Sequence, residues 1–297
     1  MRRYVPLIAG QSLRLCRCLR HSLSQYLTKK VQSRTLRVIV LVFIATQALS
    51  PSAVDGSING VAALDSGLVA YYSFDDGTAT DNSGNGNDGE VFGATPTGGV
   101  LGNALYFSGS SDYVAVPHSS TLNLTSEFTI SGWVKPVAPV AGYVPILTKG
   151  NTGDMSTPYA VVYTWTLVPH VRFTSSGGRL VLVDLPISDS LILGNWNCFA
   201  WRFAGGNLEI FRDGSKLGEH NLGIETLAAN DLPLEMGRDI PGATEFLSGT
   251  LDEIRIYNRA LSDRGVQELC GQFTIFLPLT MRPIVPTGFL PTPTPGP

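Results

Sequence analysis

The feature that most constrains the fold is a two-residue periodicity that runs from Leu68 to Leu251 and is interrupted by turn residues. Apolar and polar residues alternate in short runs, the pattern of half-buried β-strands. The runs that we predict to be strands are 68–74, 104–107, 113–116, 128–134, 159–163, 171–173, 180–183 and 197–203. Many short strands without long amphipathic helices predict an all-β fold, a two-sheet antiparallel sandwich.

The run 197–203 shows how the alternation assigns faces. Its bulky side chains share one face, which we expect to point into the core: Phe199, Trp201 and Phe203. The other face, which we expect to be wet, carries Cys198, Ala200 and Arg202. The pairs Gly205-Gly206 and Asp213-Gly214 then predict two hairpins, because two-residue primed turns need positive φ.

Charge divides the chain into a basic leader and an acidic body. Residues 1–54 contain nine Lys/Arg and no Asp/Glu, whereas the rest has twelve Lys/Arg and all 24 acidic residues, a net of −12. The acidic body argues against a nucleic-acid partner, because phosphate binding needs a basic surface. Residues 1–53 resemble a signal peptide with a long basic n-region, and the apolar run 38–45 is too short for a stable membrane span. We therefore expect a secreted or cell-surface protein.

The last segment differs from the body. Residues 271–297 predict one edge strand at 273–277, stopped by Pro278, and then a Pro/Thr-rich tail that cannot form a core. Cys198 and Cys270 would remain in the exported chain, so an oxidising compartment allows a disulfide between them. Two unpaired thiols stay open as the alternative, since spacing alone does not give geometry.

An oxygen-rich loop lies near the start of the body, between the predicted strands 68–74 and 104–107: Asp81-Asn82-Ser83-Gly84-Asn85-Gly86-Asn87-Asp88-Gly89. Its carboxylate and amide oxygens suit a hard cation such as calcium. The alternative is a glycine-rich turn whose Asn and Asp side chains hydrogen-bond to their own backbone. The residues alone leave both interpretations open.

The sequence offers no catalytic motif, so we expect no enzyme. The histidines are scattered, and no Gly-x-Ser-x-Gly elbow or zinc motif occurs. Asp252 and Glu253 are adjacent, and a regular strand would send them to opposite faces, which does not suit a pair of catalytic carboxyl groups. Tyr159, Tyr163 and Trp165 share one parity and could stack on sugar rings, although packing within the sheets is the more common role.

Five segments in order resemble a known family: 68–93, 102–107, 128–136, 194–214 and 247–269. Their strongest parts are the loop 81–89 and the run 252–261, and together they resemble the laminin-G-like, concanavalin A-like jelly-roll domain over about residues 66–270. The resemblance implies a jelly-roll sandwich whose first loop and last strand meet. It also implies a structural calcium ion with Asp81 and Asp252 as ligands. Where relatives read Trp-x-His, this chain has Trp196-Asn197-Cys198.

The functional expectation combines these observations. We expect a secreted, non-catalytic domain that binds carbohydrate or a surface protein, with calcium in a structural role. A polysaccharide-degrading enzyme and a purely structural envelope protein are the alternatives. An enzyme would require two carboxyl groups that face each other in one cleft.

Overall fold

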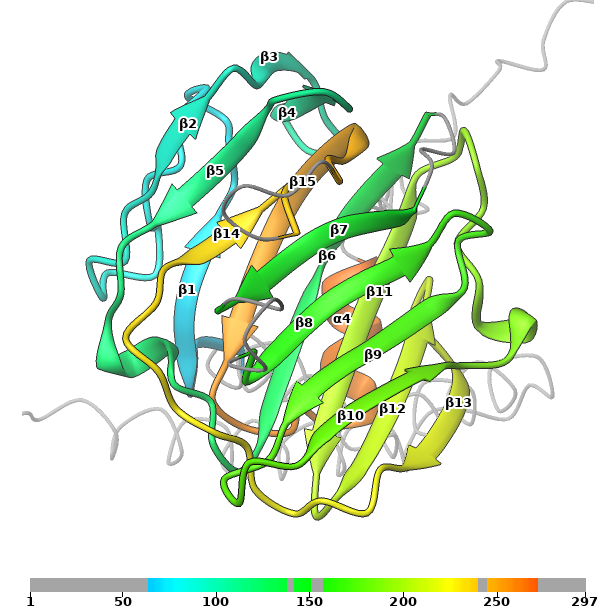
Figure 1. Ribbon diagram of the computed structural model, residues 1–297. Helices are drawn as coiled ribbons and strands as arrows, with labels where there is room; N and C mark the ends of the chain where they lie inside the picture. Colours follow the sequence, from blue (N-terminus) through cyan, green and yellow to red (C-terminus); the bar gives the residue numbers. More distant parts are fainter. Residues whose placement is uncertain (1–63, 138–141, 151–156, 240–244, 272–297) are drawn as a thin grey trace, which may run out of the picture. The chain divides into compact units, whose positions relative to one another are not determined.

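The computed structural model describes residues 64–137, 142–150, 157–239 and 245–271. The predicted signal peptide, the edge strand at 273–277 and the Pro/Thr-rich tail lie outside the described residues. The strands form two antiparallel sheets, so the all-β sandwich is confirmed. In Figure 1 the seven-stranded sheet lies in front of the eight-stranded sheet, and helix α4 (Asp263–Gly271) lies behind both.

The eight-stranded sheet has the order β13-β12-β11-β6-β15-β4-β3, and β1 pairs with β15 beside β4. Its strands are β1 (Leu68–Tyr72), β3 (Thr95–Gly98), β4 (Asn103–Ser108), β6 (Phe128–Pro136), β11 (Asn197–Ala204), β12 (Asn207–Arg212), β13 (Ser215–Asn221) and β15 (Ser248–Tyr257). β4 pairs with residues 248–251 of β15 and β1 with residues 254–257, so the two short strands meet the same edge of β15 end to end.

The seven-stranded sheet has the order β10-β9-β8-β7-β14-β5-β2. Its strands are β2 (Glu90–Phe92), β5 (Tyr113–Val116), β7 (Tyr143–Lys149), β8 (Tyr159–Thr164), β9 (Pro169–Thr174), β10 (Leu180–Asp184) and β14 (Leu234–Met236). Two short 3-10 turns, η1 (Ser120–Leu122) and η3 (Ile187–Asp189), complete the described elements between β1 and α4. Every strand pairing is antiparallel.

The core lies between the inner faces of the two sheets. Trp201 of β11 donates a hydrogen bond from Nε1 to the hydroxyl of Tyr163 on β8, 3.0 Å away, which links the sheets at their centre. The rings of Phe128, Phe173 and Phe203 pack on one another with centroids 5.6–5.9 Å apart. Each such ring contributes about 1.5–3 kcal/mol by its burial.

The predicted faces of 197–203 are half right. Phe199, Trp201 and Phe203 lie in the core, as predicted, but the opposite face is covered rather than wet. Helix α4 packs there on a second apolar cluster: Ala200, Phe211, Tyr257, Leu261, Val266 and Leu269. The prediction was wrong because strand periodicity does not show what covers the second face. Both predicted hairpins are confirmed, since Gly205, Gly206, Asp213 and Gly214 all have positive φ.

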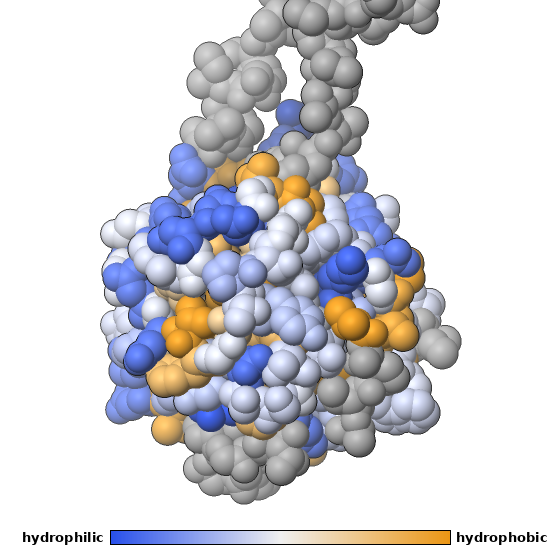
Figure 2. Space-filling view, turned by 90° about the horizontal axis from the view of Figure 1, so that it is seen from above, coloured by the Kyte–Doolittle hydropathy of each residue, from blue (hydrophilic) through white to orange (hydrophobic). Residues whose placement is uncertain are grey.

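At the end of the molecule seen in Figure 2, the apolar surface is divided into small patches by polar residues. Among the described residues, the large apolar side chains that stay exposed are few: Leu101, Tyr106, Val137, Trp165, Leu182, Val183, Ile192 and Leu193. No helix in the described part of the chain has the length and hydropathy that crossing a bilayer requires.

Candidate functional site

The outer face of the seven-stranded sheet carries a groove made of two adjoining cavities. The larger, of about 500 Å³, is lined by Gly142, Tyr143, Thr164, Trp165, Thr166, Val168, Asp184 and Leu185. The smaller, of about 270 Å³, is lined by Tyr143, Thr157, His170, Arg172, Leu180, Leu182, Asp239 and Glu245. Tyr143 belongs to both, so the two cavities form one groove across the sheet.

Alternation along the strands explains why these side chains face outward. Val161 and Tyr163 of β8 point into the core, and so do Val171 and Phe173 of β9. The residues between them therefore point to the other face, which places His170 and Arg172 in the groove. Tyr159 and Tyr163 are buried, so packing within the sandwich is confirmed for these two aromatic residues.

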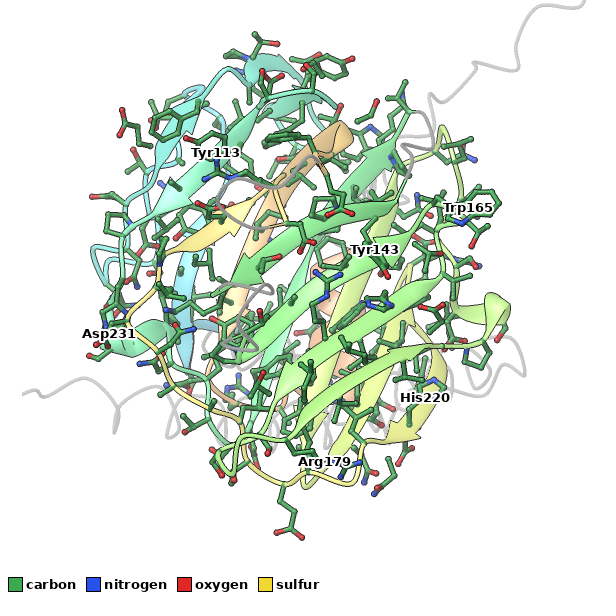
Figure 3. The ribbon with its side chains drawn as sticks, in the orientation of Figure 1. Tyr113, Tyr143, Trp165, Arg179, His220 and Asp231 are labelled. Carbon is green, nitrogen blue, oxygen red and sulfur yellow. A yellow bond between two sulfur atoms is a disulfide. The ribbon has the colours of Figure 1, made fainter. Side chains whose placement is uncertain are left out.

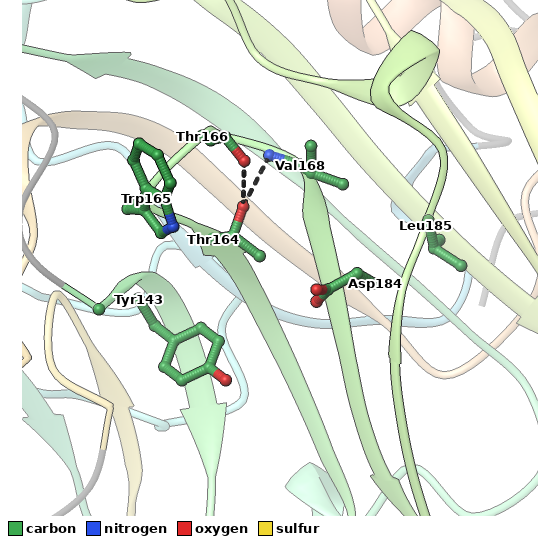
Figure 4. A pocket seen from close by; sticks show the side chains of 8 residues that line it. Tyr143, Thr164, Trp165, Thr166, Val168, Asp184 and Leu185 are labelled. Carbon is green, nitrogen blue, oxygen red and sulfur yellow. Dashed lines mark hydrogen bonds between the residues drawn. The ribbon is translucent and has the colours of Figure 1, made fainter.

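Trp165 differs from those tyrosines because it follows the end of β8. Its side chain is 61% exposed, in a tight turn before β9. The Thr164 hydroxyl shapes the turn by bonding to Thr166 Oγ1 at 2.8 Å and accepting the Val168 N–H at 3.3 Å, and Leu167 adopts φ 63°. Figure 3 shows where Trp165 and Tyr143 lie in the molecule, and Figure 4 shows them at one side of the larger cavity, with the Asp184 carboxylate pointing toward them from the opposite side.

Two ion pairs form the floor between the aromatic side chains. His170 Nδ1 donates to Asp184 Oδ1 at 2.6 Å. Arg172 Nη1 lies 2.6 Å from each oxygen of Asp239, and both partners are buried. The Tyr143 ring packs against the His170 ring at 4.5 Å and under the Arg172 guanidinium at 4.8 Å. The groove therefore combines an exposed tryptophan and a half-buried tyrosine with fixed polar groups, the composition of a small-ligand site.

A second carboxyl group lies beside Asp239. Burial raises the pKa of Glu245, and the negative charge of Asp239 and a hydrogen bond between the two side chains raise it further. Both acids line the smaller cavity.

Asp81, a predicted calcium ligand, is the centre of the loop 81–89. Its Oδ1 accepts the N–H groups of Tyr71 and Ser83, and its Oδ2 accepts that of Asn87, all at 2.9 Å. Burial raises the pKa of Asp81, but the hydrogen bonds from Ser83, Tyr71 and Asn87 outweigh it, and the pKa lies below its usual value. The backbone-bonded turn is therefore observed, and a role for Asp81 in calcium binding stays a prediction.

Asp252, the other predicted ligand, lies fully buried on β15 between the segments that pair with β4 and β1. Its Oδ2 accepts the N–H groups of Val100 and Leu101 at 2.7 and 3.1 Å. Its Oδ1 is buried and has no hydrogen-bond partner. Burial raises the pKa of Asp252 to about 6, although the two backbone N–H groups oppose the shift. A buried carboxylate with a free oxygen fits a cation.

The hairpin loop 99–102, which contains Val100 and Leu101, is held from its other side by Asp75. The sequence had not indicated a role for Asp75. Asp75 Oδ1 accepts the Asn103 N–H at 2.9 Å, and the Asn103 side chain donates to the Asp75 carbonyl at 2.7 Å. Gly99 and Gly102 allow these approaches: a Cβ on Gly99 would lie 2.5 Å from Asp252 Oδ2, and one on Gly102 would overlap Asp75 Oδ1. The hairpin loop 99–102 thus lies between two aspartates.

Asp81 and Asp252 share no hydrogen-bond donor. The first loop and the last strand do meet through Tyr71 of β1, whose N–H donates to Asp81 and whose hydroxyl donates to Glu253 Oε1 at 2.8 Å. Within the described residues, no three His, Cys, Asp or Glu side chains gather in a metal-binding cluster.

The expectation that Asp252 and Glu253 point to opposite faces is wrong, because β15 bulges between them. Trp133 of β6 pairs with Asp252 and Ser131 with Arg255, so two residues of β15 oppose the single Gly132. Glu253 is the extra residue, with φ 55°. Since Leu251 and Ile254 both lie in the core, both acids lie on the outer face.

Cys198 and Cys270 are joined in a disulfide, with Cα atoms 5.5 Å apart and a sequence separation of 72 positions. The bond ties helix α4 to β11 and fastens the helix over the outer face of the eight-stranded sheet.

The groove itself was largely missed by the sequence analysis. Tyr143 lies on β7, which was not predicted because Pro145 interrupts the run and a bulge between Pro145 and Leu147 shifts its periodicity. Asp239 and Glu245 follow β14, a strand of only three residues. The detectable signal was the pair Thr164-Trp165 at the end of a strong strand, because an aromatic residue there falls in an exposed turn.

Comparison with known proteins agrees with this architecture. Residues 108–267 match the laminin G family that is described as the concanavalin A-like lectin/glucanases superfamily. The chain therefore belongs to this superfamily. No match was found among curated proteins.

Solved structures show the same fold at low identity. Domain 4 of AbnA, a GH43 extracellular arabinanase from Geobacillus stearothermophilus, aligns with a TM-score of 0.55 and 18% identity over 68% of this chain and 98% of that domain. The binding domain of Paraclostridial Mosquitocidal Protein 1 aligns with a TM-score of 0.58 and 18% sequence identity over 71% of this chain. The binding domain of Botulinum Neurotoxin serotype G aligns with a TM-score of 0.55 and 14% sequence identity over 69% of this chain. The chain spans about half of the two toxin structures, 53% and 51%.

Proposed function

We propose that this protein is a carbohydrate-binding domain whose ligand lies in the groove around Tyr143. The observation that carries the proposal is the placement of exposed Trp165 and half-buried Tyr143 opposite the Asp184 carboxylate. Aromatic faces stack on the apolar faces of sugar rings, and a carboxylate accepts hydrogen bonds from sugar hydroxyl groups. Domain 4 of AbnA, which shares the fold, was solved in complex with arabinotriose, and this supports the same class of ligand.

A glycan array tests the proposal directly. We expect the wild-type protein to bind one or more oligosaccharides, and Trp165→Ala to lose that binding while keeping its melting temperature. Tyr106→Ala is the matched control, because Tyr106 is a partly exposed aromatic residue on the other sheet. Absence of binding to every glycan would refute the proposal, and so would equal losses in the two variants.

The role that we propose is binding rather than hydrolysis. Asp239, which shares the smaller cavity with Glu245, is a buried side chain. Asp239 is also held by Arg172 through both its oxygens. Release of reducing sugar from any bound polysaccharide would contradict a purely binding role.

A protein ligand is the second candidate, favoured by apolar side chains beside the groove. Leu191 N–H donates to the Leu167 carbonyl, and Gly194 N–H donates to the Pro136 carbonyl, so the exposed Ile192 and Leu193 lie near the turns that carry Trp165 and Val137. An apolar rim of this kind is typical of protein contacts. The variant I192S/L193S would separate the candidates, since it should weaken a protein complex and leave a soluble oligosaccharide bound.

We also propose a structural calcium ion at the loop 99–102. The support is the buried Asp252 Oδ1 without a partner, because burying an ionised carboxylate is costly unless a cation or hydrogen bonds compensate it. Asp252 and Asp75 are the side chains that would hold the ion, and calcium would supply the missing positive charge between them. Asp81 is retained as a candidate ligand from the family resemblance.

Secretion or cell-surface exposure completes the proposal. The Cys198–Cys270 disulfide supports it, because disulfides persist mainly in oxidising compartments. The basic, apolar leader at residues 1–53 supports it independently. Fractionation of the native host, with the N-terminus of the mature protein determined by mass spectrometry, would test both export and the cleavage position.

A further inference from the structure

We infer that the groove selects neutral oligosaccharides and rejects anionic ones, an inference that rests on the proposed carbohydrate-binding function. The basis is the charge of the side chains that line it. Two are cationic or can become so, His170 and Arg172, whereas three are acidic, Asp184, Asp239 and Glu245. An anionic sugar would need a cation that is not already bound to a carboxylate.

Neither potential cation in the groove is available. Arg172 Nη1 binds both oxygens of Asp239 at 2.6 Å, and the pair is buried. His170 Nδ1 donates to Asp184, and the ring is packed against Tyr143. A ligand carboxylate or sulfate would have to displace a protein carboxylate from one of these pairs. Displacing Asp239 would leave a buried charge without its partner, which is strongly unfavourable, and displacing Asp184 would cost the ligand the hydrogen bond between Asp184 and His170.

Neighbouring cations on the same sheet are also held. Arg238 forms two hydrogen bonds to Glu235 and lies over the Tyr113 ring at 3.6 Å. Lys149 is fully buried, and its Nζ donates to Asn230 Oδ1 at 2.8 Å. Arg179 donates to the Gly223 carbonyl and lies at the opposite end of β9 and β10 from Trp165 (Figure 3). The sequences 138–141, 151–156 and 240–244 contain no Lys or Arg.

The exposed acids make the field in the groove negative. The Asp184 side chain is largely exposed although it accepts a hydrogen bond from His170, and its carboxylate faces Trp165 and Tyr143. Glu245 lines the second cavity beside Asp239. Like charges placed together across an interface cost several kcal/mol in general, so a uronic acid, a sialic acid or a sulfated sugar would be repelled. The hydroxyl groups of a neutral sugar would instead donate to these carboxylates.

The test is an array of matched pairs. Each neutral oligosaccharide is accompanied by a counterpart whose C6 hydroxymethyl groups are oxidised to carboxylates, and lactose is accompanied by sialyllactose. We expect every neutral oligosaccharide that binds to have an affinity at least about tenfold higher than that of its acidic counterpart. Raising the salt concentration should narrow the difference, because salt screens exposed charges.

Two variants connect the preference to these residues. In Asp184→Asn and Glu245→Gln, which remove one charge each at nearly constant shape, the ratio of neutral to acidic affinity should fall several-fold. Asp231→Asn serves as control, because Asp231 is an exposed aspartate that lines neither cavity.

The outcomes are distinguishable. Equal or tighter binding of the acidic partners overturns the charge inference while the carbohydrate-binding function stands. An unchanged ratio in both variants also overturns it. Absence of binding to neutral and acidic glycans alike refutes the proposed function itself, and this inference with it.

Discussion

The rings of Tyr143 and His170 meet above strand β8, with centroids 4.5 Å apart, although their own strands β7 and β9 are not neighbours in the sheet. Val162 of β8, which pairs in register with His170 and points to the same face, is fully buried. The two rings therefore form a ridge that joins the cavities of the groove. A ligand that occupies both cavities must cross this ridge, so we expect affinity to increase from monosaccharide to trisaccharide.

Replacing Trp165 by alanine should reduce oligosaccharide affinity about fivefold or more, since stacking of this kind is worth about 1 kcal/mol or more. Because the side chain is largely exposed, the free energy of unfolding should change by less than about 0.5 kcal/mol. Isothermal titration calorimetry and thermal denaturation measure the two effects. A variant that loses binding only by unfolding would not support a contact role.

Removing calcium should lower the melting temperature by about 5–10 °C if the free calcium concentration was about one hundred times the dissociation constant of the site. Asp252→Asn should remove the response to chelator, and Asp75→Asn should weaken it. Asp81→Asn should destabilise the loop with or without calcium, because Asp81 accepts three backbone N–H groups. Differential scanning calorimetry with and without chelator checks this. If chelator leaves the melting temperature of the wild-type protein unchanged, a tightly bound structural ion is excluded.

The pH dependence of the calcium-free protein follows from Asp252. Its pKa in the folded protein is about 6, above the ordinary 3.8, so the folded state binds a proton more tightly than the unfolded state does. The stabilisation is complete below pH 4 and is lost as the pH rises to about 6, with a magnitude of up to about 3 kcal/mol. In Asp252→Asn this part of the profile should be flat. Urea titrations between pH 4 and 7 in chelator measure it, and a wild-type profile that matches the variant would contradict it.

Reducing the disulfide should destabilise the fold by about 4 kcal/mol, because the cross-link closes a loop of about 70 residues. The double variant C198S/C270S should show the same loss and no further effect of reductant. Equilibrium unfolding with and without reductant is the measurement. Since the groove lies on the other sheet, glycan affinity below the unfolding transition should not change.

The sequence predicts the parts of the fold that local chemistry determines. Phe199, Trp201 and Phe203 alternate without interruption, and Gly205-Gly206 and Asp213-Gly214 allow turns that few other residues can form, so the core strand and both hairpins were predictable. The position of helix α4 over Ala200 and Phe211, in contrast, depends on contacts far apart in the chain.

The groove was harder to predict because its residues come from distant segments. Asp239 meets Arg172 across 67 positions, and no local pattern indicates that pairing. Tyr143 lies in a strand that contains Pro145, and a proline within a short run argues against a strand when the sequence is considered alone. Asp252 was found only through the family resemblance, and Asp75 was not found at all, since its partner Asn103 is 28 residues away.

The bulge at Glu253 gives one position of β15 an unusual tolerance of a change in chain length. Ile254 lies in the core and Asp252 does not, although residues two apart in a regular strand share a face, and the additional residue between them accounts for the difference. Deleting Glu253 would restore strict alternation and leave its neighbours on the faces that they already occupy, with Leu251 and Ile254 in the core and Asp252 outside. Loss of this one amino acid should therefore preserve the core, and its cost should come from the hydrogen bonds that Glu253 accepts from Tyr71 and Arg255.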